Sequence, residues 1–125
     1  MKVLIIEDND NDAQLFKKLL QREGCEVEIS TNATEAVPRA QRGKFDVVLT
    51  DLNLGGDNGN EGHKLIMELR ASFPKTRIIA ISGQVTQKNM LPVASTLGAV
   101  RTLAKPFTPQ ELLNTVNDVL QSSSR

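Results

Sequence analysis

Residues 3–8, VLIIED, join a continuous apolar run to two carboxylates, and residues 47–51, VVLTD, repeat that arrangement. A third run, Ile78–Ser82, is rich in isoleucine and ends in a hydroxyl. Short continuous apolar runs bounded by polar residues are typical of strands buried on both faces, as in parallel sheets. The three runs therefore predict the central strands of a parallel sheet.

Two further segments have the weaker pattern of strands at the edges of a sheet. Glu26–Ser30 alternates charged with apolar residues, and Val100–Ala104 carries an arginine and a threonine. Such half-exposed strands belong at sheet edges. With the second and fifth strands at the edges, the order is 2-1-3-4-5, which is the flavodoxin-like, doubly wound arrangement.

Helical patterns alternate with the strands, which predicts an α/β fold with right-handed crossovers. Asp10 is the predicted N-cap of the first helix and Gly24 its stop. Thr108 and Glu111 have the spacing of a capping box at the start of the last helix. The five predicted helices are Asn11–Glu23, Thr34–Gln41, Glu61–Phe73, a segment within Gln87–Leu97, and Pro109–Leu120.

Composition restricts the class of protein. The chain has 125 residues, which we interpret as one domain over residues 1–121 with a disordered tail at 122–125. Lys plus Arg and Asp plus Glu both number 15, so bulk charge gives no reason to expect nucleic-acid or membrane binding. No apolar run exceeds four residues, and no signal peptide is expected. The single Cys25 suits a reducing cytoplasm.

The predicted order brings five polar residues to the carboxyl ends of the strands, where doubly wound sheets bind ligands. They are Glu7, Asp8, Asp51, Ser82 and Lys105. Three carboxylates in one crevice repel each other unless a cation lies among them, and oxygen ligands of this kind suit Mg²⁺. The lysine and the serine hydroxyl can bind an anion. The pattern therefore predicts a site for a phosphoryl group on or near a carboxylate.

Over nearly its whole length the chain resembles the receiver domains of bacterial two-component response regulators. Each short motif is weak alone, but their order and spacing together are specific. The motifs are Ile5-Ile6-Glu7-Asp8-Asn9, Val48–Leu54, Ile81-Ser82-Gly83, and Gly98-Ala99 with Lys105-Pro106-Phe107.

The resemblance implies a role for each residue of the site. Asp51 would accept a phosphoryl group from a phosphohistidine of a sensor histidine kinase or a phosphotransfer protein. Asp8 would bind Mg²⁺ directly and Glu7 through water, and Asp51 and the carbonyl of Asn53 would complete the protein ligands. The other two roles are the switch hydroxyl at Ser82 and the phosphate-pairing cation at Lys105.

The resemblance also implies a signalling domain that catalyses only its own phosphorylation and dephosphorylation. The sequence does not identify the downstream protein that would respond.

Three departures from the family pattern concern switching. Thr102 stands where the family usually has an aromatic ring, Gly55 where it usually has proline, and Pro92 interrupts the fourth predicted helix. Thr102 is too small to act as a rotating lever. We therefore expect phosphorylation to order residues Gln84–Lys88 and Gly55–Gly62 instead.

Two other classes share parts of the pattern. A phosphatase of the haloacid dehalogenase type would use Asp8, Asp10, Ser82 and Lys105, but it needs an acidic pair after the lysine, and Asp118 has no acidic neighbour with which to form one.

A passive metal- or flavin-binding module is the second alternative. Asp8, Asp10 and Asp12 begin like a calcium loop, but Ala13 and Leu19 replace the required glycine and closing acid. We interpret Asp10 and Asp12 as a cap and a first-turn acid instead. A flavin phosphate would face the carboxylates that follow the first strand.

Overall fold

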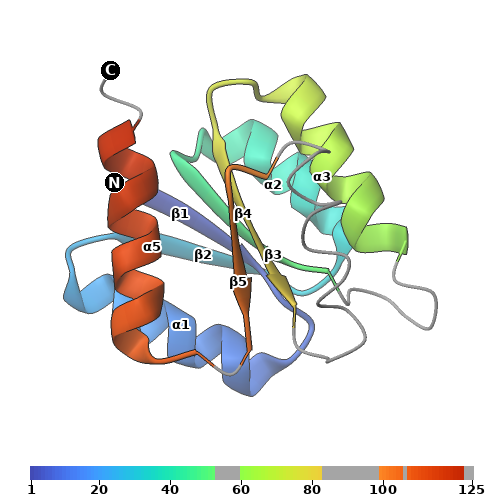
Figure 1. Ribbon diagram of the computed structural model, residues 1–125. Coiled ribbons are helices and arrows are strands. Elements are labelled where there is room, and N and C mark those ends of the chain that lie inside the picture. The colour runs from blue at the N-terminus through green and yellow to red at the C-terminus, as the bar shows by residue number, and fades with distance from the viewer. Residues whose placement is uncertain (53–59, 83–98, 106, 123–125) are drawn as a thin grey trace.

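The computed structural model describes residues 1–52, 60–82, 99–105 and 107–122. Five parallel strands form one sheet in the order β2-β1-β3-β4-β5 (Figure 1), which confirms the predicted arrangement. The most buried strands are the apolar ones, β1, β3 and β4, and the two mixed segments lie at the edges, because only strands covered on both faces need continuous apolar runs. The strands are β1 Lys2–Ile6, β2 Glu26–Ser30, β3 Val47–Asp51, β4 Arg77–Ser82 and β5 Arg101–Ala104.

Helices cover both faces of the sheet (Figure 1). Helices α1 and α5 lie on one face, and α2 and α3 lie on the other. The predicted fourth helix within Gln87–Leu97 falls outside the described residues, as do predicted ordering segments at 84–88 and 55–59. The described helices are α1 Asp10–Arg22, α2 Ala33–Gly43, α3 Asn60–Ser72 and α5 Pro109–Ser122.

Alternate residues of each central strand build two separate cores. In β1, Leu4 and Ile6 pack against α2 and α3, whereas Val3 and Ile5 pack against α1 and α5. All four side chains are buried, so β1 is anchored from both sides. This double anchoring fixes where the polar residues that follow β1 leave the sheet.

The ends of the helices correct two predictions. Asn9, not Asp10, caps α1, because its Oδ1 accepts a hydrogen bond from Asp12 N at 3.0 Å and the helix starts one residue earlier than predicted. Helix α5 continues to Ser122, two residues past its predicted end and into the expected tail.

The capping box of α5 is confirmed by hydrogen bonds of 3.1 and 3.2 Å between Thr108 and Glu111. Within the described ranges, no helix combines the length and the apolar character needed to span a membrane.

Candidate functional site

Four of the predicted site residues come together at the carboxyl ends of the strands. The register pairs Asp51 of β3 with Ile81 of β4, and Ser82 of β4 with Ala104 of β5, so these strands end side by side. Glu7 follows β1 directly. Lys105 follows β5, and its backbone N–H donates to Ser82 O at 2.7 Å. Glu7, Asp51 and Ser82 are only 1%, 4% and 1% exposed.

The ammonium of Lys105 is the centre of this site. Its Nζ lies 2.8 Å from Glu7 Oε1, 3.0 Å from Asp12 Oδ2 and 3.1 Å from Asp51 Oδ2. An ammonium has three N–H donors, so each carboxylate can take one of them. We call Glu7, Asp12, Asp51 and Lys105 the rim cluster.

The ring of Phe16 in α1 packs beside the side chain of Lys105. Lys105 Nζ lies 5.8 Å from the centroid of the Phe16 ring, which in turn packs against Phe107 with a centroid distance of 5.4 Å. Phe16 is almost wholly buried in the core between α1, α5 and the sheet. The rings thus form an apolar wall beside the long side chain and limit the positions that its ammonium can take.

The rim cluster carries more negative than positive charge. Burial raises the pKa of Glu7 to about 7, the hydrogen bond from Lys105 opposes that rise, and the charge of Asp51 adds to it. Burial alone would lower the pKa of Lys105. Its hydrogen bonds to Glu7 and Asp12, together with the charge of Asp51, nevertheless raise that pKa above its usual range. The lysine is therefore a permanent cation, and its single charge does not balance the carboxylates around it.

The remaining predicted site residues lie around this cluster. Asp8 is exposed at the surface beside Glu7. Thr102 is half-buried in β5, where it pairs with Ala80 of β4. Asn53 lies outside the described residues.

Asp12 is a member of the cluster that sequence reasoning missed. It occupies the first turn of α1, as predicted, but its carboxylate reaches Lys105, which is 93 positions away along the chain. An acid in a first helical turn has an adequate local explanation in the helix dipole. No local signal distinguishes it from one that also holds a distant lysine.

The types of donor atom at the rim suit Mg²⁺, although the described side chains are not arranged as a metal site. Buried carboxylates with an excess of negative charge, next to an exposed third carboxylate, are the hard oxygen donors that this ion prefers. No group of three or more His, Cys, Asp or Glu side chains is arranged to hold a metal ion in the part of the chain that the structure describes. Lys105 Nζ contacts both buried carboxylates, Glu7 and Asp51, and the predicted carbonyl ligand of Asn53 is not among the described residues.

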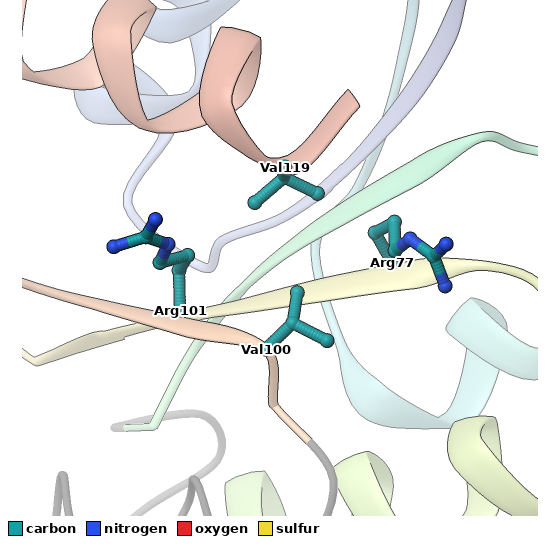
Figure 2. A pocket seen from close by; sticks show the side chains of 4 residues that line it. All are labelled: Arg77, Val100, Arg101 and Val119. Atoms are coloured by element: carbon teal, nitrogen blue, oxygen red, sulfur yellow. The ribbon is translucent and has the colours of Figure 1, made fainter. Parts of the chain in front are cut away.

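A small pocket of about 130 Å³ lies at the opposite end of the sheet (Figure 2). It is lined by Arg77, Val100, Arg101 and Val119, at the starts of β4 and β5 and on α5. Asp118, the acid that a dehalogenase-type phosphatase would need beside its lysine, forms an ion pair with Arg101 at 3.9 Å. It therefore belongs to this end of the molecule and not to the rim cluster.

Comparisons with known proteins agree with this arrangement. A family model for the response regulator receiver domain matches residues 3–117. The crystal structure of a response regulator receiver domain protein from Clostridium thermocellum superposes with a TM-score of 0.88 at 26% identity, covering 98% of this chain and 96% of that one.

Two curated relatives are much longer than this chain. The transcription factor SKN7 of Candida albicans is 32% identical over 110 residues, which are 88% of this chain and 19% of that protein. The transcriptional regulatory protein ResD of Bacillus subtilis is 27% identical over 124 residues, which are 99% of this chain and 50% of that protein. The chain thus spans half or less of the length of these relatives.

Proposed function

The chain belongs to the response regulator receiver domain family of two-component signalling, and we propose that Asp51 is its phosphoacceptor. A carboxylate oxygen of Asp51 attacks the phosphorus of a phosphohistidine on a sensor histidine kinase or a phosphotransfer protein. A new O–P bond forms while the N–P bond breaks, and the histidine nitrogen keeps the electron pair. The product is an aspartyl phosphate that changes the affinity for a downstream protein.

The contact between Lys105 and Asp51 carries this proposal. A permanent ammonium 3.1 Å from a buried carboxylate is a fixed positive charge beside the position where phosphoryl oxygens would arrive. Fixed charges of this kind stabilise phosphoryl transfer, because the reaction depends mainly on positioning and electrostatics. Asp51 is itself the last residue of the central strand β3, and doubly wound sheets bind ligands at the carboxyl ends of such strands.

Mg²⁺ is part of the same proposal. Asp8, Asp51 and the carbonyl of Asn53 would hold the ion directly, and Glu7 would hold it through water. When bound, it would neutralise part of the charge on the phosphoryl oxygens. Within this arrangement, the residues of the chain orient the phosphoryl group through Lys105 and keep the nucleophile in place by burying it.

Ser82 is the proposed switch hydroxyl. It is the last residue of β4 and is buried next to β5, two positions along β4 from the register partner of Thr102. Because a threonine is small, the change at Ser82 would be passed on by neighbouring segments and not by rotation of an aromatic ring. A cytoplasmic location completes the proposal, since the single Cys25 suits a reducing compartment.

Incubation with acetyl phosphate and Mg²⁺, followed by intact-mass measurement, tests the proposal. The unaltered protein and the Asp118→Asn control should each gain one phosphoryl group, whereas Asp51→Asn should gain none. The amide keeps the shape of the carboxylate but is not a nucleophile. Labelling of Asp51→Asn at the unaltered rate would show that another residue is the acceptor. Continuous release of phosphate without a stable mass gain would indicate a phosphatase instead.

A further inference from the structure

Lys105 is held by three carboxylates that come from three different elements. Glu7 follows β1, Asp51 ends β3, and Asp12 lies in the first turn of α1. The backbone of Asp12 is fixed at the start of α1, because Asp12 N donates to Oδ1 of the capping residue Asn9. All three donors of the ammonium are therefore occupied in the unphosphorylated protein.

A phosphoryl group on Asp51 would need one of these donors. It carries up to two negative charges and three acceptor oxygens, and it would be attached to a carboxylate that Lys105 Nζ already contacts. An ammonium whose donors are all in use can bind a new oxygen only by leaving an old one. The question is which of its three carboxylates it leaves.

Exposure to solvent identifies the contact that is easiest to break. The side chains of Glu7 and Asp51 are 2% and 5% exposed, whereas that of Asp12 is 39% exposed. A carboxylate that leaves an ion pair is rehydrated at once if water reaches it, but it loses that compensation when it is buried. The contact with Asp12 is therefore the weakest of the three.

We infer that Asp12 is a positioning residue that holds Lys105 in the unphosphorylated protein and competes with the phosphoryl group for it. This inference rests on the proposed function, because it concerns the same reaction at Asp51. On phosphorylation, one N–H of Lys105 stops donating to Asp12 Oδ2 and donates to a phosphoryl oxygen instead. Glu7 continues to accept a hydrogen bond from the ammonium. The release of Asp12 also breaks the ion pair that links the end of β5 to the first turn of α1.

The test measures the affinity for beryllofluoride, a non-covalent phosphoryl mimic, by titration calorimetry in saturating Mg²⁺. Asp12→Asn removes the competing charge but leaves Lys105 its two buried partners. The dissociation constant of beryllofluoride should fall about two- to fivefold, which is the range that an exposed ion pair is worth. The rate of labelling by acetyl phosphate should rise by a similar factor.

Asp10→Asn is the matched control. It removes the same charge from the same helical turn, but none of the three hydrogen bonds of Lys105 Nζ goes to Asp10. It should leave the affinity within experimental error of the unaltered protein. Asp12→Glu, which restores a carboxylate near the lysine, should return the affinity toward the original value. A general effect of charge or helix stability would move Asp10→Asn as well.

Two results would overturn the inference alone. One is an equal effect of Asp12→Asn and Asp10→Asn, and the other is weaker binding of beryllofluoride by Asp12→Asn, which would mean that Asp12 assists the phosphoryl site. Failure of the unaltered protein both to bind beryllofluoride and to be labelled by acetyl phosphate would overturn the proposed function, and the inference with it.

Discussion

Both ends of the sheet carry charged side chains, but those in ion pairs are more deeply buried at one end than at the other. At the carboxyl ends of the strands, Glu7 and Asp51 are buried and share the ammonium of Lys105. At the amino ends, the ion pairs that the structure describes lie at the surface. Arg101 and Asp118, for example, are 54% and 57% exposed and 3.9 Å apart.

Exposed and buried charges differ in what they contribute to the stability of the fold. Exposed pairs such as the one at the amino end contribute little, because water and salt screen them and each partner is hydrated without the other. Buried carboxylates lose that hydration and depend on Lys105, so the carboxyl end is destabilising unless its cation is present. An arrangement that costs stability and shifts a pKa in a shared cluster is typical of a functional site.

Removal of the shared cation should affect both stability and labelling. Lys105→Ala leaves two buried carboxylates without their ammonium, and we expect the free energy of unfolding in EDTA to fall by about 2 to 3 kcal/mol. Labelling of Asp51 by acetyl phosphate should slow by about 100-fold or more, because a fixed positive charge is lost from the transition state. Urea titrations and intact-mass time courses measure the two effects.

Lys2→Ala is the matched control at the amino end. Its Nζ lies 3.6 Å from Glu28, whose side chain is 42% exposed, so its loss should lower the free energy of unfolding by less than about 1 kcal/mol. Equal losses for Lys105→Ala and Lys2→Ala would show that the two ends of the sheet do not differ in the way that their burial indicates.

Much of this contrast follows from sequence patterns. Continuous apolar runs identified the central strands to within one residue, and the mixed runs identified the edges, because burial on one or both faces directly determines these patterns. The order of the strands then brought Glu7, Asp51 and Lys105 to one rim. These inferences depend on periodicity and topology, which local sequence encodes.

Side-chain contacts between distant elements are not encoded in this way. Asp12 looks like any acid in a first helical turn, and only the folded chain shows that it reaches Lys105. The N-cap of α1 was misplaced by one residue because Asn9 and Asp10 are equally good caps. The choice between them depends on where β1 delivers the chain, which is a property of the whole fold.

A change of pH should alter the stability that the carboxyl end contributes more than the stability that the amino end contributes. Burial raises the pKa of Glu7 from an ordinary value of 4.5 to about 7. Between these values the native protein keeps a proton that the unfolded chain has lost, so the free energy of unfolding should fall as the pH rises through this window. The contribution of Glu7 should be on the order of 3 kcal/mol, given about 1.4 kcal/mol per pKa unit.

Glu7→Gln should remove this contribution, since the amide is neutral throughout. Urea titrations in EDTA from pH 4.5 to 7.5 would measure the difference between the two proteins. Glu26→Gln, a change to an exposed side chain at the start of β2, should retain the slope of the unaltered protein. A slope that survives in Glu7→Gln would assign the pH dependence to another group.

Mg²⁺ should restore part of the stability that is lost through the repelling carboxylates at the carboxyl end. An ion that binds only the native state adds about 2.7 kcal/mol to the free energy of unfolding at a hundred times its dissociation constant. Asp8→Asn should weaken this stabilisation and should itself stabilise the metal-free protein, because one of the repelling carboxylates is gone. Asp46→Asn, at the amino end, should preserve the response. Thermal unfolding with and without Mg²⁺ would show no shift if the rim does not bind the ion.

Two threonines offer the smallest and most local comparison of the two ends. Thr50, next to Asp51, is wholly buried, and its Oγ1 finds no hydrogen-bond partner among the residues that the structure describes. Thr76, before β4, donates from its Oγ1 to Phe45 O at 3.0 Å. An unsatisfied buried hydroxyl is destabilising, whereas a satisfied one contributes about 1 kcal/mol.

The same substitution should therefore have opposite signs at the two positions. Thr50→Val should raise the free energy of unfolding by about 1 kcal/mol, and Thr76→Val should lower it by about the same amount. Valine keeps the branched shape and suits a strand, so packing changes little. Urea titrations of both variants test the signs directly, and a loss of stability in Thr50→Val would contradict the comparison. If Thr50→Val is more stable but is labelled more slowly at Asp51, the hydroxyl is kept at the carboxyl end for the reaction and not for the fold.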